Sequence, residues 1–77
     1  MSDHVYKVIE LVGSSKDSVE DAVQGAISRA SETIQGLDWF AIKEVRGNIQ
    51  DGKVGWYQVT LSVGFQVKSP EDMKKGE

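Results

Sequence analysis

Within the extended segment Val54–Val67, the chain alternates between apolar residues and polar or small ones from Tyr57 onward. The apolar positions are Tyr57, Val59, Leu61, Val63, Phe65 and Val67, and the positions between them carry Gln58, Thr60, Ser62, Gly64 and Gln66. Successive side chains of a β-strand point to opposite faces, so this pattern predicts a strand with one apolar face and one polar face. Another part of the chain has to cover the apolar face, and this requirement constrains the fold more than any other feature.

A helix is expected to provide that cover. Apolar or small residues recur at steps of three and four from Val19 to Ile34, which is the spacing of one face of an α-helix. Ser18 is the expected N-cap, because its hydroxyl can accept a hydrogen bond from a free backbone N–H. Gly36 is expected to end the helix in the left-handed conformation. The alanines at positions 22, 26 and 30 allow a sheet to approach this face closely.

Two further segments are predicted to be extended. Val5–Val12 is apolar and β-branched before a turn at residues 13–15, and Trp39–Ile49 precedes the pair Asp51-Gly52. Asp-Gly between two extended segments is a strong signal for a two-residue hairpin turn. The order is therefore β-α-β-β, and we predict an α+β fold in which a three-stranded antiparallel sheet packs around one helix.

The 77 residues are expected to form a single domain, with an ordered core over residues 4–68 and a charged tail over residues 69–77. A chain of this length buries only about 60% of the surface that its unfolded form exposes, so its core is marginal. Because the chain has no cysteine, no disulfide can supplement that core. Self-association is the expected source of additional buried surface.

The charge balance and hydropathy argue against two classes of partner. The chain has 9 basic and 12 acidic residues, a formal charge of −3 and no stripe of Lys or Arg, which is unlike a nucleic-acid-binding surface. No apolar run approaches the roughly 20 residues that span a bilayer, and the first residues do not resemble a secretory signal peptide. We expect a cytoplasmic protein that binds neither nucleic acid nor membrane.

The hairpin register predicts the direction of Trp39. If residues 51–52 form a two-residue turn, counting outward from the turn sets Phe40 opposite Val63 and Trp39 opposite Gly64. Directly opposed residues lie on the same face of a sheet, so Phe40 joins the core and Trp39 joins the polar face. The tryptophan is therefore expected to point away from the helix of its own chain.

The same count places Ile42 in the core and Ala41 on the polar face, and it sets Gln58 opposite Val45. It also turns the apolar Val45 outward, which predicts a β-bulge or a strong twist near residues 43–45. Gln58 then lies far along the hairpin from the tryptophan. A ligand that touches both side chains needs a bulge, a curled sheet or a second subunit.

The polar face beside Trp39 has room for a ligand, because Ala41, Ser62 and Gly64 are all small. A flat aromatic ligand would stack on the indole there. The same residues fit a second explanation, in which Trp39 packs against another subunit or covers the bare glycine. The pattern alone leaves both open, and Trp56 near the hairpin tip is expected to be an interface or surface anchor.

The residues suited to acid-base or phosphate chemistry are isolated from one another. His4 is the only histidine and lies near the N-terminus, so no catalytic dyad can be built on it. The spacing of Glu10, Asp38 and Glu44 does not single out an acid-base pair. Arg46 could hold a phosphate or stack on a ring, although a lone arginine is more often an ion-pair partner.

Four stretches of the chain, in this order, resemble the dodecin family: VYKVIELVGSS, SVEDAVQGAISRAS, LDWFAIKEVRG and YQVTLSVGF. The resemblance extends from about Val5 to Val67, and the DWF segment followed by K-E-x-R-G and Y-Q-V is its most specific part. Dodecins are small flavin-binding proteins of β-α-β-β fold that assemble as hollow dodecamers. They hold flavins in stacked pairs between aromatic side chains of symmetry-related subunits, and they are storage proteins, not enzymes.

The resemblance implies roles for residues already identified. Trp39 matches the family tryptophan that stacks on the isoalloxazine ring, and Gln58 matches the glutamine whose amide hydrogen-bonds to the polar edge of that ring. Arg46 matches an arginine near the flavin, and Ala41 is expected to line the site beside the tryptophan. The implied protein is a homododecamer that stores riboflavin or FMN and has no catalytic or metal-binding residue.

One position departs from the family pattern. Some bacterial dodecins have a basic residue after Gly-Phe in the last strand, associated with nucleotide-type ligands such as coenzyme A, where this chain has Gln66. Arg46 is then the remaining cation for a flavin phosphate. Two other functions stay open: an assembly module in which Trp39 is an interface residue, and a small flavoenzyme, for which no acid, base or nucleophile is found beside the ring.

Overall fold

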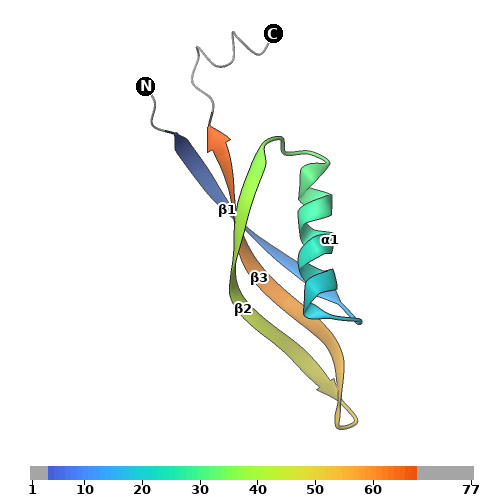
Figure 1. The fold of residues 1–77 in the computed structure, drawn as a ribbon. Helices are drawn as coiled ribbons and strands as arrows, with labels where there is room; N and C mark the ends of the chain where they lie inside the picture. Colours follow the sequence, from blue (N-terminus) through green and yellow to red (C-terminus); the bar gives the residue numbers. More distant parts are fainter. Residues whose placement is uncertain (1–3, 68–77) are drawn as a thin grey trace.

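The computed structural model describes residues 4–67, and the expected tail at residues 69–77 lies outside them. Four elements follow one another along the chain: β1 (Val5–Ser15), α1 (Val19–Ser31), β2 (Leu37–Gln50) and β3 (Lys53–Val67). The strands form one antiparallel sheet in the order β1-β3-β2, and the helix lies on one face of it (Figure 1). The predicted α+β fold with β-α-β-β order is confirmed.

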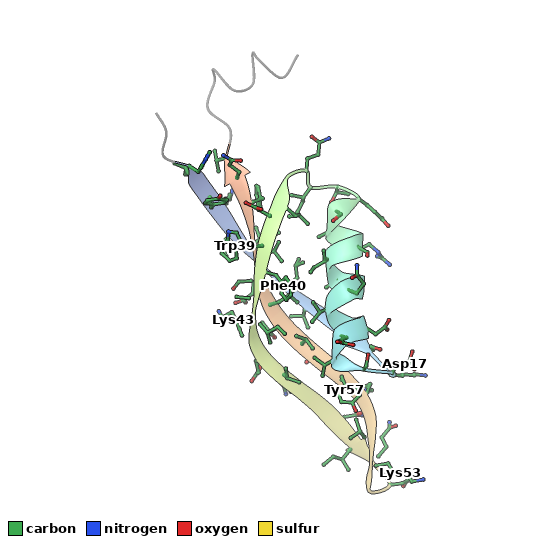
Figure 2. The ribbon with its side chains drawn as sticks, viewed as in Figure 1. Asp17, Trp39, Phe40, Lys43, Lys53 and Tyr57 are labelled. Atoms are coloured by element: carbon green, nitrogen blue, oxygen red, sulfur yellow. The ribbon has the colours of Figure 1, made fainter. Side chains whose placement is uncertain are left out.

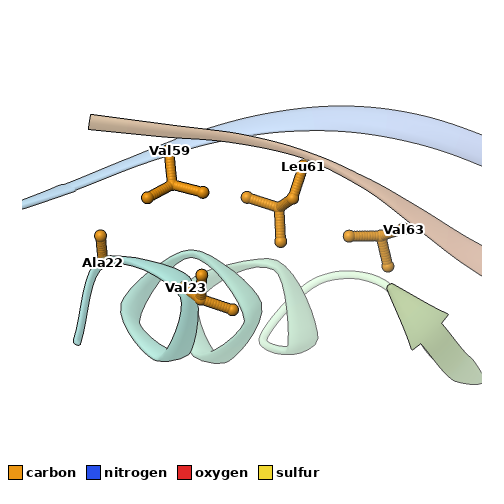
Figure 3. Packing of buried hydrophobic residues seen from close by; sticks show 5 residues of the cluster. All are labelled: Ala22, Val23, Val59, Leu61 and Val63. Carbon is orange, nitrogen blue, oxygen red and sulfur yellow. The ribbon is translucent and has the colours of Figure 1, made fainter. Parts of the chain in front are cut away.

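The core lies between the central strand β3 and the helix. Val59, Leu61 and Val63 are at most 2% exposed, and they form a row along β3 that faces Ala22 and Val23 of α1 (Figure 3). These three residues belong to the apolar set of the alternating stretch. The predicted inward face of this strand is therefore confirmed.

The helix covers only part of the sheet, because it packs mainly against β1 and β3. An α-helix with its side chains is about 10 Å wide and strands are about 4.8 Å apart, so one helix covers about two strands. Phe40 and Ile42 of β2 are on the helix side of the sheet but remain 48% and 47% exposed. The prediction that both join the core of the single chain is wrong, although the predicted direction of their side chains is right.

The hairpin turn between β2 and β3 has the predicted two residues. Asp51 and Gly52 have φ angles of 53° and 76°, so both adopt the left-handed conformation that such a turn requires, and Gln50 pairs with Lys53. Far from the turn, Trp39 pairs with Gly64, as the count from the turn predicts.

Two β-bulges lie between these points and compensate for each other. Gly55 is an extra residue on β3 and Lys43 is an extra residue on β2, so the register is shifted by one position only between them. In that interval Val45 pairs with Val59 and returns to the helix side of the sheet. The bulge expected near residues 43–45 is confirmed, whereas the expected pairing of Val45 with Gln58 is wrong.

The helix begins as predicted and ends earlier than predicted. The Ser18 hydroxyl accepts a hydrogen bond of 3.0 Å from the backbone N–H of Asp21, as expected of an N-cap. The helix ends at Ser31, and Glu32 is its C-cap. The backbone N–H groups of Thr33 and Ile34 both donate to the carbonyl of Ala30, which closes a tight turn after the helix. Gly36 has a φ of 81° but lies in the connection to β2 and is not the helix cap.

No helix in the described part of the chain is long and apolar enough to cross a membrane.

Gly13 belongs to a strand and not to the turn expected at residues 13–15, since β1 continues to Ser15. It pairs with Val59 and faces the helix. A Cβ at this position would lie 2.9 Å from the Cβ of Ala26 and would overlap with the carbonyl oxygen of Ala22. The glycine is therefore needed for the close approach of helix and sheet.

Candidate ligand-binding face

The residues predicted to bind a ligand lie on the sheet face opposite the helix, which we call the outer face. Paired residues cross this face in rows, which are Val8–Gly64–Trp39, Glu10–Ser62–Ala41, Val12–Thr60–Glu44 and Ser14–Gln58–Arg46. Trp39 and Ala41 thus occupy neighbouring rows at one end. Arg46 and Gln58 share one row nearer the hairpin tip.

A third bulge directs Trp39 onto the outer face. Leu37 pairs with Phe65 and Trp39 pairs with Gly64, so Asp38 between them has no partner in the ladder. Without the extra residue, positions 37 and 39 would point to the same side of the sheet. With it, Leu37 packs against the hydrophobic core while Trp39 points outward, on the opposite side of β2 from Phe40 (Figure 2).

The indole of Trp39 lies directly on Gly64. A Cβ at position 64 would be 2.7 Å from the indole Nε1 and still closer to Cε2 and Cζ2. The ring therefore rests on the backbone of β3 and uses the space where a side chain would stand. Trp39 is nevertheless 42% exposed. This geometry supports the expectation that the indole covers the bare glycine, and it leaves part of the ring accessible for stacking.

Tyr6 of β1 contacts the same indole from the other edge of the sheet. The two ring centroids are 6.4 Å apart, with an angle of 61° between the ring planes, which is an edge-to-face arrangement. Loss of hydration raises the pKa of the Tyr6 hydroxyl, and the negative charge and hydrogen bonding of the Asp38 carboxylate raise it further. Tyr6 is thus in contact with the indole and close to the bulged aspartate beside it.

His4 lies at the end of the outer face next to this aromatic pair. Its ring Nδ1 is within hydrogen-bonding distance of the side-chain amide of Gln66, which pairs with Tyr6 across the sheet. The histidine is exposed, and its ring contacts the side chain of Gln66 on β3.

The row next to the indole is bounded by an ion pair. Ala41 and Ser62 lie in this row, and both carry small side chains. The Lys43 ammonium reaches across the sheet from its bulge and contacts the Glu10 carboxylate at 2.6 Å. The hydrogen bond and the charge of Glu10 raise the pKa of Lys43, so the lysine remains protonated in this pair. The small residues Ala41 and Ser62 therefore leave an open area between the aromatic pair Tyr6–Trp39 and the ion pair Lys43–Glu10.

Gln58 and Arg46 are brought together by the compensating bulges. They pair directly across β3 and β2, and Ser14 pairs with Gln58 from the other side. A hollow of about 370 Å³ lies beside Gln58, and its lining is Ser14, Ser15, Lys16, Trp56 and Gln58. The side-chain amide offers both a hydrogen-bond donor and an acceptor, and the guanidinium offers a cation. This end of the outer face is therefore suited to a polar or anionic part of a ligand.

The structure does not bring Trp39 and Gln58 together within one chain. Gly64, which supports the indole, and Gln58 are six positions apart on β3. At roughly 3.3 Å per residue this is about 20 Å along the strand, which is longer than a fused three-ring system. The four predicted site residues thus form two groups on one face, namely Trp39 with Ala41 and Gln58 with Arg46.

Two residues of the outer face, Tyr6 beside the indole and Lys43 beside Glu10, are not predicted by the sequence. Tyr6 reaches the indole through the pairing of β1 with β3, and no short turn connects these strands to fix their register. Lys43 reaches Glu10 because it is the extra residue of a bulge whose position was predicted only within residues 43–45. The sequence offered no signal for Tyr6 beyond its aromatic character.

Comparison with known proteins agrees with this architecture. The model of the family described as Dodecin matches residues 5–68. A curated dodecin of Thermus thermophilus is 50% identical over 64 residues, which are 83% of this chain and 93% of the relative. The dodecin of Streptomyces coelicolor has a solved structure with a TM-score of 0.82 and 49% identity, covering 90% of this chain and 99% of that one.

The dodecin of Streptomyces davaonensis gives a second structural match, with a TM-score of 0.81 and 44% identity, over 88% of this chain and 100% of that one. The family match, the sequence identity and the shared fold all extend over the strands and the helix described above. The chain belongs to the dodecin family.

Proposed function

We propose that this chain is a flavin-binding storage protein that stacks the isoalloxazine ring of riboflavin or FMN on Trp39, without turnover. The observation that carries the proposal is the indole of Trp39, which is supported by Gly64 on one side and remains 42% exposed. Stacking on such a ring supplies dispersion and π-interaction to any flat aromatic ligand. The small Ala41 and Ser62 beside it leave room for the ligand.

The complete site is proposed to form between subunits. Trp39 of one copy would hold the ring face, and Gln58 of a second copy would hydrogen-bond to the ring edge, because the two side chains of one chain lie too far apart for one ring system. The amide of Gln58 matches a ring edge that presents both donors and acceptors. Arg46, which pairs with Gln58, would then be the cation nearest to a flavin phosphate.

Self-association of the chain is supported by its exposed apolar residues. Phe40, Ile42 and Val45 lie on the helix side of β2 and are 47–49% exposed in the single chain. A second copy that covers them would add the buried surface that a domain of this size lacks. The homododecamer implied by the family is the assembly that we propose, and the cytoplasmic location stays a prediction.

A physical consequence of stacking is rapid quenching of the excited flavin by the indole. The protein would then act as a flavin buffer that limits photochemical damage while holding the ligand. Bound flavin that remains brightly fluorescent would count against this role.

The proposal is tested by titrating ligand-stripped protein into riboflavin and, separately, FMN at a fixed low concentration while following flavin fluorescence. Saturable quenching is expected with the unaltered chain. Trp39→Ala is expected to abolish quenching while the assembly, measured by sedimentation velocity, is retained. Val12→Ala is the control, because it removes an exposed apolar side chain from the same face two rows away.

Two results would contradict the proposal. Unchanged fluorescence with both ligands would remove the flavin site, and disassembly of Trp39→Ala would favour the alternative in which the tryptophan is an interface residue of an assembly module. The ratio of the two midpoints reports whether the phosphate is recognised. A preference for FMN that disappears in Arg46→Ala would assign that recognition to the arginine.

A further inference from the structure

The indole of Trp39 is held from two directions by groups of its own chain. Gly64 lies beneath it, and the ring of Tyr6 meets it edge-to-face at a centroid distance of 6.4 Å. Tyr6 pairs with Gln66 and so stands in the outer-face row next to Val8–Gly64–Trp39, two residues along each strand. Because the glycine between them has no side chain, the two rings can meet above β3.

An indole on an exposed strand can rotate about two side-chain bonds, and each orientation presents a different surface to a ligand. Contact with the glycine backbone alone would not stop the ring from turning away from the sheet. The edge contact with Tyr6 opposes that rotation on one side. An edge-to-face pair adds to the stability of the arrangement beyond the area that it buries.

The environment of Tyr6 keeps the tyrosine itself in place. Its side chain is 40% exposed, and the carboxylate of Asp38, the bulged residue next to the tryptophan, is close enough to influence the pKa of its hydroxyl. Loss of hydration and the nearby carboxylate both raise the pKa of the Tyr6 hydroxyl, so the neutral form that can donate to Asp38 persists. Tyr6 and Trp39 are therefore linked through the contact of their rings and through Asp38, the neighbour of Trp39 in β2.

We propose that Tyr6 is a positioning residue that holds the Trp39 indole flat over Gly64, so that its outward side is presented to the flavin ring. This inference rests on the flavin-binding function proposed above. It assigns no contact between Tyr6 and the ligand. The tyrosine acts by restricting the indole before the ligand arrives, which lowers the ordering cost of binding.

The test uses variants in a Trp56→Phe background, in which Trp39 is the only tryptophan. Two quantities are measured: the fluorescence anisotropy and near-ultraviolet dichroism of Trp39 without ligand, and the midpoint of flavin quenching. Tyr6→Ala is expected to lower the anisotropy and the dichroism and to weaken flavin binding roughly two- to tenfold. Tyr6→Phe keeps the ring and is expected to retain most of both signals, whereas Val12→Ala is the control on the same strand.

The results separate this inference from the proposed function. If the unaltered chain does not bind flavin, the proposed function fails, and the indole signals of the Trp56→Phe variants still test the role of Tyr6. If the parent binds flavin and Tyr6→Ala changes neither signal, the inference is wrong. Weaker binding with an unchanged indole would also overturn it, because Tyr6 would then contact the ligand itself. Tyr6→Leu, which keeps apolar volume without a ring, replaces Tyr6→Ala if that variant does not fold.

Discussion

Trp39 lies over Gly64 so closely that a methyl group on the glycine would overlap with the indole, at 2.7 Å from Nε1 and at shorter distances from two ring carbons. The exposed aromatic ring thus depends on the absence of one side chain on the neighbouring strand. Gly64 has no positive φ, so its backbone conformation does not require glycine. The space beneath the indole is the reason for this residue.

Gly64→Ala is therefore expected to displace the indole and weaken flavin binding about tenfold or more, since overpacking of a close contact typically costs about 1–3 kcal/mol. The fold should persist, because the indole can move outward into solvent. Fluorescence quenching of FMN measures the first effect, and far-ultraviolet dichroism measures the second. Gly25→Ala is the matched control, since a Cβ there meets nothing within 4 Å. Unchanged affinity in Gly64→Ala would show that the orientation of the indole does not matter.

Gly13→Ala is expected to destabilise the chain by about 1–3 kcal/mol, because the added methyl group would overlap with the carbonyl of Ala22 and force helix and sheet apart. Urea denaturation monitored by helix dichroism measures the free energy of unfolding. Ser14→Ala, at the next and exposed position of β1, is the control. Equal midpoints for Gly13→Ala and the unaltered chain would mean that the helix can shift without loss of packing.

The hydroxyl of Tyr6 is expected to titrate above the usual pKa of 10.0. Tyrosinate absorbance in a Tyr57→Phe background isolates this group. Asp38→Asn should bring the pKa back only in part, because loss of hydration, the larger cause, remains. A raised pKa means that the folded state favours the protonated hydroxyl, so its stabilising contribution is complete below pH 10.0 and is lost as the pH rises through the folded pKa. A pKa at or below 10.0 in the folded protein would contradict the arrangement.

Phe40→Asp is expected to weaken self-association while the fold of the single chain persists. Phe40 is 48% exposed, so the charge stays hydrated in the monomer, whereas an interface that covers β2 would have to bury it. Sedimentation velocity across a range of protein concentrations measures the change. Ser28→Asp adds the same charge to the exposed side of the helix and serves as the control. If both variants assemble like the unaltered chain, the interface does not include this side of β2.

Local chemistry in the sequence determined the elements and much of the register. The alternation along β3 predicts its buried row, and the helix start follows from the N-cap Ser18. The turn at residues 51–52 predicts the pairing of Trp39 with Gly64. That pairing holds because the two bulges add one residue to each strand and cancel, so a simple count gives the right partner at the far end.

Tertiary packing decided the pairing of β2 with β3 between the turn and the Trp39–Gly64 pair. The pairing of Arg46 with Gln58 depends on where the bulges fall, and a bulge forms where the apolar side chains of β2 return to the helix side, as Val45 does opposite Val59. The exposure of Phe40 depends on the width of one helix relative to three strands. Neither the position of the bulges nor the exposure of Phe40 can be read from a short stretch of sequence.

The aromatic pair Tyr6–Trp39 likewise depends partly on local sequence and partly on tertiary packing. The sequence predicts that Trp39 points outward, because a two-residue turn and the period of a strand are local rules. It does not predict that Tyr6 meets the indole, since β1 and β3 are far apart in the chain and only packing against the common helix sets their register. The sequence by itself thus determined which face carries the indole, and the tertiary structure decided which side chains hold it there, because long-range register depends on how the whole core packs.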